Sequence, residues 1–223
     1  MTDTTLIVAA HPDDEVLGMG GTLAKLVNLG HDVHVVFFTD GESSRGRDRV
    51  QEAVSRMNSA KLAAAVIGYS ISNIQNFNFP DNGLDTVPLL DLVQKLEAVI
   101  DEVKPNCVYT HHHNDLNIDH RRVHMATMTA CRPQPGNLVK LIYEFYVPSS
   151  SDWNTVRENH ANTFVDISEF IACKYQAIDC YKDEIREYPH QRSLTAIKIS
   201  DQYFGNMVGL AHAEAFNLIR QLT

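Results

Sequence analysis

Short apolar stretches alternate with helix-like patterns along the first 130 residues, and this alternation constrains the fold of the chain more than any other feature. Stretches with the composition of buried strands lie at residues 4–10, 33–38 and 106–110. Stretches with apolar residues three and four positions apart, as in amphipathic helices, lie at residues 17–29, 49–67 and 87–104. This alternation predicts an α/β protein with a mostly parallel sheet and helices on both faces.

The remaining sequence continues the alternation without a clear break. We expect a strand that runs into a loop at 71–85, a polar loop at 111–120, a helix at 120–131, strands at 138–148 and 163–167, and a long helix at 168–188. Asp166 or Ser168 is the expected N-cap of that long helix. No internal repeat, low-complexity tract or linker is present, so we expect residues 1–223 to form one domain.

Charge and composition indicate which class of molecule the protein binds. The formal net charge of -9 disfavours nucleic acid and anionic membranes and favours a small-molecule substrate. The longest apolar runs fall short of the ~18 residues that a membrane span needs. The first residues lack the basic region of a signal peptide, so we expect a cytoplasmic protein with four scattered structural thiols. A homo-oligomer remains possible, because interface and core residues look alike in sequence.

Two charged clusters follow predicted strands. The run HPDDE begins at His11, directly after the strand at 4–10, and the run HHHNDLNIDH at 111–120 follows the strand at 106–110. In a parallel α/β sheet, ligands bind outside the carboxyl ends of the strands, where the connecting loops gather. We therefore expect these two runs to meet at one site.

The residue types of the two runs are those of a catalytic zinc site. Such a site needs three histidine or carboxylate ligands and an open position for water. His11 and Asp14 supply two ligands, the second run supplies a third, and Asp13 is then free to accept a proton from water. Alternatively, Asp13, Asp14 or Glu15 caps the next helix, but one carboxylate suffices for that. Because three adjacent acids repel one another, we favour the metal site.

Other polar residues have simpler interpretations. Five histidines without a partner pattern are expected to be structural or surface residues: His31, His34, His124, His160 and His190. The three histidines at 111–113 are ambiguous, because only some side chains of an extended segment point inward. The run GMGG at 18–21 lacks the spacing of a phosphate-binding loop and favours a closely packed helix.

The two runs resemble the hallmark motifs of the LmbE/PIG-L family of zinc-dependent de-N-acetylases. AHPDDE at 10–15 resembles the first motif, and THHHNDLNIDHRRVH at 110–124 resembles the second. Weaker similarities to the family lie at 39–42 (TDGE), 79–81 (FPD), 104–111 (KPNCVYTH), 164–168 (FVDIS) and 211–216 (AHAEAF).

The resemblance implies a Rossmann-like fold, one zinc ion per chain and removal of the acetyl group from an N-acetylglucosamine-like amino sugar or its conjugate. By position it implies that His11, Asp14 and His120 are zinc ligands and that Asp13 is the general base. Asp119 would be an acid that orients the pocket. Arg56 and Asp81 resemble positions that contact the sugar, and His212 is a further candidate for contact with the substrate.

Asn117 marks a departure from the family pattern. Many members have histidine there, which helps to stabilise the oxyanion or to protonate the leaving group, and asparagine can donate a hydrogen bond but cannot shuttle a proton. We therefore expect this catalytic role to be lost, filled by Asp13 alone, or taken by His113 or His212. Asn117 also keeps open an alternative function, a metal- or sugar-binding protein without turnover. A second alternative, within the family, is an amidase for a larger acyl group.

Overall fold

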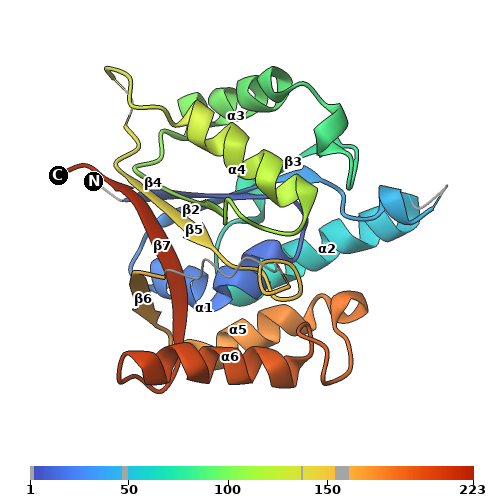
Figure 1. Ribbon diagram of the computed structural model, residues 1–223, viewed down its shortest axis with the longest axis vertical. Helices are drawn as coiled ribbons and strands as arrows, with labels where there is room; N and C mark the ends of the chain where they lie inside the picture. Colours follow the sequence, from blue (N-terminus) through green and yellow to red (C-terminus); the bar gives the residue numbers. More distant parts are fainter. Residues whose placement is uncertain (1–2, 47–49, 137, 154–160) are drawn as a thin grey trace.

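The computed structural model describes residues 3–46, 50–136, 138–153 and 161–223. Its described residues form one seven-stranded sheet in the order β3-β2-β1-β4-β5-β7-β6 (Figure 1). The strands are β1 (Thr4–Ala9), β2 (Asp32–Thr39), β3 (Ile74–Phe79), β4 (Cys107–His111), β5 (Leu141–Phe145), β6 (Thr163–Asp166) and β7 (Ala213–Gln221). The α-helices are α1 (Asp14–Asn28), α2 (Val50–Ile67), α3 (Leu89–Val103), α4 (Ile118–Ala130), α5 (Ile171–Asp179) and α6 (Leu194–Met207).

Five neighbouring strands are parallel, and this confirms the predicted α/β fold with a mostly parallel sheet. β1 pairs in parallel with β2 and β4, which in turn pair in parallel with β3 and β5. β7 runs antiparallel between β5 and β6. The carboxyl ends of β1 and β4 therefore lie side by side at one edge of the sheet.

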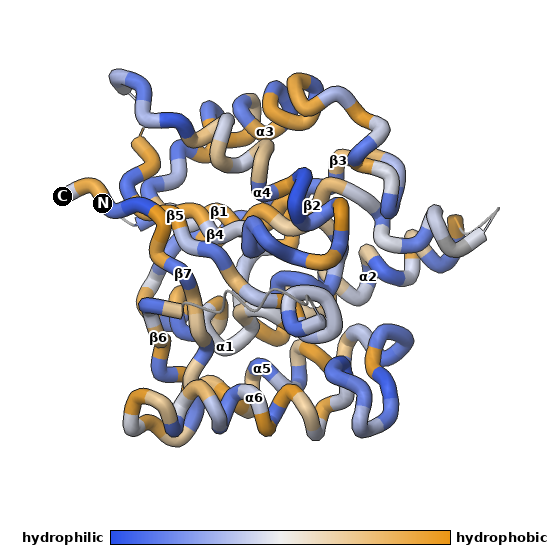
Figure 2. Tube along the Cα trace, viewed as in Figure 1, coloured by the Kyte–Doolittle hydropathy of each residue, from blue (hydrophilic) through white to orange (hydrophobic). Residues whose placement is uncertain are grey.

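The central strand β1 is buried on both faces because its residues alternate between two hydrophobic cores. Ile7 and Ala9 belong to the core beneath α1, α2, α5 and α6, whereas Leu6 and Val8 belong to the core beneath α3 and α4. Figure 1 shows these two helical layers on opposite sides of the sheet. Figure 2 shows hydrophobic and hydrophilic residues alternating along α6, as expected for a helix with one face on the core.

The predicted long helix at 168–188 is wrong. The helix α5 is only nine residues long, its N-cap is Phe170 instead of Asp166 or Ser168, and a short 3-10 helix follows at Lys182–Glu184. The chain leaves the α-helical path after Asp179, which brings the buried side chains of Tyr181 and Glu184 to polar partners near the end of β1. Local helical spacing could not reveal these distant partners.

Other boundaries shift by a few residues. α1 begins at Asp14 instead of residue 17, α4 begins at Ile118 instead of residue 120, and β5 occupies only the middle of the predicted 138–148 strand. α6 and β7 were not predicted from the sequence. Residue 49, the first residue of the predicted helix at 49–67, and His160 lie outside the described residues.

Two further expectations from composition can be compared with the fold. The four cysteines are free thiols, of which Cys107 and Cys131 are buried, while Cys173 and Cys180 are half-buried. Within the described ranges, no helix combines the length and the apolar character needed to cross a membrane.

Candidate metal centre

Three side chains from the two charged runs meet at the carboxyl ends of β1 and β4. His11 lies just after β1, Asp14 is the first residue of α1, and His120 lies in the first turn of α4. His11 Nδ1 is 3.2 Å from Asp14 Oδ2 and 3.2 Å from His120 Nε2, and His120 Nε2 is 3.4 Å from Asp14 Oδ2. The structure thus brings together the two runs that the sequence places about a hundred residues apart.

The spacing of the three atoms fits a tetrahedral zinc site. Zinc binds nitrogen and carboxylate oxygen at about 2.0–2.1 Å, so ligand atoms around a tetrahedral ion lie about 3.3–3.4 Å apart. Two histidines and one aspartate are also a donor set that zinc prefers, and all three residues are buried.

The outer nitrogens of both histidines are held by carboxylates. His11 Nε2 is 3.2 Å from Asp119 and 3.3 Å from Asp81, and His120 Nδ1 is 3.1 Å from Asp115. Carboxylates in these positions fix the histidine rings so that Nδ1 of His11 and Nε2 of His120 are the nitrogens that can bind a metal ion. Asp119 also accepts backbone N–H groups in the loop after β3, and it thereby ties that loop to the cluster.

The charges around the cluster favour an ionised Asp14. Burial raises the pKa of this carboxyl, but the neighbouring His120 and His111 reverse that effect and hold the pKa well below its usual range. Burial lowers the pKa of His120, but Asp14 and Asp115 outweigh it and raise the pKa to about 9. The cluster therefore attracts positive charge, either a proton or a metal ion.

Asp13 has a distorted backbone and one unpaired oxygen. Its φ of 131° is unusual for a residue other than glycine, and its side chain makes no capping hydrogen bond to α1. Arg56 and Arg192 donate to Oδ2 at 2.9 and 3.1 Å, whereas the buried Oδ1 has no hydrogen-bond partner among the described residues. Burial is the largest influence on Asp13, and it raises the pKa of the carboxyl despite the two arginines. The interpretation of Asp13 as a simple helix cap thus gains no support.

Glu15 holds the backbone of Asp13 in place through hydrogen bonds. Its two oxygens accept the hydroxyl of Tyr181 at 2.6 Å and the N–H of Asp13 at 3.0 Å. Burial raises the pKa of Glu15 to about 8, and these hydrogen bonds oppose that rise.

Arg56 is a buried residue in contact with Asp13. Besides Asp13, it donates to the carbonyl of Pro12 at 2.8 Å and to Glu42 at 3.0 Å, and it pairs with Glu184 at 2.5 Å. Together with Asp13, these partners occupy Nε, Nη1 and Nη2 of the guanidinium group. The geometry therefore favours a role in holding Asp13 over the direct sugar contact implied by the family resemblance.

Asn117 and His212 have structural partners in this fold. Asn117 is the N-cap of α4, and its Oδ1 accepts the N–H of Asp119 at 2.8 Å. The backbone of His212 exchanges hydrogen bonds with Ser168 near the start of β7. Among the described residues, His212 has no contact with the three clustered side chains, whereas Asp81 lies beside His11.

The three histidines at 111–113 have different environments. His111 is buried, accepts the N–H of Ala10 through Nε2, and stacks on His120 with 3.8 Å between ring centroids. His112 is buried near Glu144, and His113 is exposed with Nδ1 3.0 Å from the same carboxylate. His124, which we expected to be structural, also lies 3.2 Å from Glu144.

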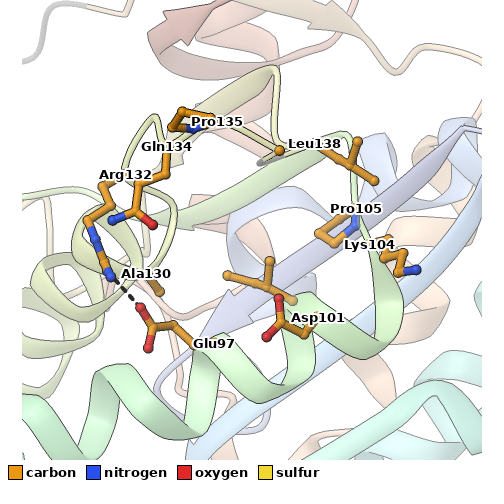
Figure 3. Close-up of a pocket in the computed structure, with 11 residues that line it drawn as sticks. Glu97, Asp101, Lys104, Pro105, Ala130, Arg132, Gln134, Pro135 and Leu138 are labelled. Atoms are coloured by element: carbon orange, nitrogen blue, oxygen red, sulfur yellow. Dashed lines mark hydrogen bonds and ion pairs between the residues drawn. The ribbon is translucent and has the colours of Figure 1, made fainter.

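A separate pocket of about 560 Å³ lies at the opposite edge of the sheet (Figure 3). It is lined by residues that precede β4 and β5, including Lys104 and Pro105, and by an ion pair of Glu97 with Arg132 at 2.6 Å. None of the clustered histidines or aspartates lines this pocket, so it is distinct from the candidate metal centre.

Four residues at or next to the centre were not predicted from the sequence: Arg192, Glu184, Asp115 and Ser150. Arg192 pairs with Asp13, Glu184 pairs with Arg192, and Ser150 Oγ lies 3.1 Å from His120 Nδ1. Asp115 is part of the second charged run, so the resemblance gave a partial signal for this residue. The other three lie in segments without a metal-site pattern, and only the fold brings them to the centre.

Comparisons with known proteins show the family to which this chain belongs. A model of the family PIG-L, GlcNAc-PI de-N-acetylase, matches residues 6–131. Over 135 residues, the chain is 33% identical to the uncharacterized deacetylase YaiS of Escherichia coli K12, which covers 58% of this chain and 69% of that protein. Over 166 residues, it is 31% identical to the 1D-myo-inositol 2-acetamido-2-deoxy-alpha-D-glucopyranoside deacetylase of Mycolicibacterium smegmatis, which covers 63% of this chain and 57% of that protein.

A solved structure extends the similarity in fold over almost the whole chain. N,N'-diacetylchitobiose deacetylase from Pyrococcus horikoshii superposes with a TM-score of 0.80 at 21% identity, covering 98% of this chain and 84% of that one. The chain belongs to the PIG-L family of de-N-acetylases, which are hydrolases that act on amide bonds.

Proposed function

We propose that this protein is a zinc-dependent deacetylase that removes the N-acetyl group of an N-acetylglucosamine-like amino sugar or its conjugate. The observation that carries the proposal is the triangle of His11, Asp14 and His120 beside the unpaired Oδ1 of Asp13. The triangle supports one zinc ion per chain. The substrate class is supported by the family match and by the acetamido sugar in the name of the mycobacterial relative.

The residues around the site suit amide hydrolysis. A zinc ion held by such ligands supplies a Lewis acid that polarises a carbonyl and lowers the pKa of water. Asp13 Oδ1 accepts the proton of the attacking water, because burial raises the proton affinity of this carboxyl and no donor occupies that oxygen. The same carboxyl then hands the proton to the departing amine, so no proton shuttle is required of Asn117.

The other predicted site residues have supporting roles in this proposal. Asp119 orients His11, and Arg56 fixes Oδ2 of Asp13 so that Oδ1 faces the reaction. Asp81 lies next to His11, at the position where the resemblance implies a contact with sugar hydroxyls. The contacts of Asn117 and His212 give no support to a direct role of either residue in the chemistry.

We also infer which part of the chain carries out the reaction and in which compartment. Residues 1–223 would act as one deacetylase domain on a small molecule in the cytoplasm. A homo-oligomer stays a prediction of the sequence.

The test is a mass-spectrometric screen of N-acetylated amino sugars and their conjugates with the zinc-loaded protein, beside a chelator-treated control. We expect a free amine and one equivalent of acetate in the zinc sample only. Release of a longer acid from acyl conjugates would instead identify the amidase alternative. Tight sugar binding without any acid release would identify a binding protein.

A further inference from the structure

Trp153 is an exposed aromatic residue in the turn that follows β5. It is the only tryptophan of the chain, and 49% of its surface is accessible to solvent. The indole contacts the ring of His190 edge to face, with 5.2 Å between centroids and 71° between planes. Such a contact fixes the orientation of the indole and leaves much of its surface uncovered.

The two segments that meet at this pair also touch the candidate metal centre. Three residues before Trp153, Ser150 Oγ lies 3.1 Å from His120 Nδ1. Two residues after His190, Arg192 donates to Asp13 Oδ2 at 3.1 Å. Arg192 Nε also donates to Ser149 Oγ at 2.8 Å, which links the two segments directly. The Trp153–His190 pair is therefore anchored on both sides to residues of the centre.

Arg192 leaves one donor group available. Its Nε and Nη1 are engaged by Ser149, Asp13 and Glu184, but Nη2 has no hydrogen-bond partner within the described part of the chain. Its side chain is 18% exposed, unlike the buried Arg56. His190 links the two side chains, because its ring contacts the indole of Trp153 and its Nδ1 accepts the backbone N–H of Arg192 at 3.0 Å. Together the guanidinium and the indole offer one polar donor and one apolar face, the combination that ligand sites use to fix a substrate.

We propose that Trp153, His190 and Arg192 form the wall of a sugar-binding subsite beside Asp13. The indole packs against the apolar C–H face of a pyranose ring, and Arg192 Nη2 donates to a sugar oxygen while its Nη1 holds Asp13. This inference rests on the proposed function and specifies which residues recognise the sugar. Carbohydrates suit this wall because a pyranose presents C–H groups on its faces and hydroxyl groups around its rim.

The single tryptophan makes binding directly observable. Zinc-loaded Asp13→Asn protein, in which turnover should be slowed by about 10²–10⁴-fold, is titrated with N-acetylglucosamine, and tryptophan emission is recorded in parallel with calorimetry. We expect a saturable change in emission with the dissociation constant found by calorimetry. Trp153→Ala in the same background should bind the sugar about threefold to tenfold more weakly, in line with the loss of one aromatic contact. Its zinc content should be unchanged.

Tyr203→Ala is the matched control, because Tyr203 is a similarly exposed aromatic residue on α6. This variant should keep the affinity for the sugar and the emission change. In the otherwise unchanged enzyme, Trp153→Ala should raise KM by the same factor as the dissociation constant and change kcat little. Unchanged affinity in Trp153→Ala, while calorimetry still detects the sugar, would overturn the inference and leave the proposed function standing. A protein that neither binds nor deacetylates any N-acetyl sugar would overturn both.

Discussion

At the scale of single residues, the centre is organised around the different surroundings of the two oxygens of Asp13. Arg56 and Arg192 both donate to Oδ2, and Oδ1 stays without a partner in the described structure. A buried carboxylate oxygen without a donor costs stability, so its retention next to three metal-ligand candidates indicates a functional group. The positive φ of Asp13 is a second cost that the fold retains at this position.

Asp13→Asn tests the role of the carboxylate. Asparagine tolerates the positive φ and has nearly the same shape, but it cannot accept a proton from water. We expect deacetylation to fall by about 10²–10⁴-fold, the range of general acid–base catalysis. Metal analysis should still find one zinc per chain, and turnover at the parent rate would exclude Asp13 as the base.

His120→Ala tests the ligand set. Removing one of three protein ligands should lower both the zinc content and the activity, because two ligands bind zinc weakly. The matched control is His34→Ala, since His34 pairs with Asp32 away from the centre. Plasma emission spectrometry after dialysis gives the zinc content. Equal zinc in the two variants would contradict the assigned site.

At the scale of secondary structure, the site depends on how closely α1 packs against its neighbours. The glycines of this helix lie where a side chain would collide: a Cβ on Gly18 would lie 2.5 Å from the ring of Phe145, and one on Gly21 would lie 2.8 Å from Ile167. The sequence run GMGG predicted this close approach. α1 begins with Asp14, so its position also sets the position of a metal ligand.

Gly21→Ala should destabilise the protein by about 1–3 kcal/mol, the usual cost of overpacking a core. Gly20→Ala in the same helix is the comparison, because its Cβ would lie 3.2 Å from Cγ of Lys174, a wider gap than the 2.8 Å at Gly21. Urea denaturation followed by circular dichroism measures both costs. A Gly21→Ala protein as stable as the Gly20→Ala protein would show that Ile167 yields without strain.

At the scale of the whole molecule, a buried ion cluster joins α5, α6 and β7. Lys174 Nζ lies 2.6 Å from Asp201 and 2.9 Å from Glu214, and Glu214 also accepts the N–H groups of Gly21 and Thr22 in α1. The cluster thereby links the C-terminal elements to the helix that carries Asp14.

Lys174→Met should cost about 3–5 kcal/mol, because it leaves two carboxylates buried without their cation. Burial opposes the charge on Lys174, but Asp201 and Glu214 raise the pKa of the amine above its ordinary value. The stability from this charge is therefore complete below the ordinary lysine pKa and is lost as pH rises from about 10.4 towards the folded value.

The pH dependence of the unfolding free energy distinguishes the contribution of the Lys174 charge from the contribution of its packing. The unfolding free energy of the parent should fall more steeply above pH ~10 than that of Lys174→Met, by up to about 1.4 kcal/mol per pH unit for one proton. Several buried tyrosines with raised pKa values, such as Tyr181, contribute to the fall in both proteins. Identical slopes in denaturant titrations between pH 9 and 11 would show that folding does not raise the pKa of Lys174.

The sequence by itself determined the α/β fold, the mostly parallel sheet and the meeting of HPDDE with the second charged run. These features follow from local periodicity and from the rule that parallel strands gather their carboxyl ends at one edge. Only the tertiary structure decided that Arg56 donates to Asp13 and that Arg192 reaches the same carboxylate from the C-terminal half. These contacts join residues 43 and 179 positions apart, and the path of the chain between them depends on packing and carries no periodic signal.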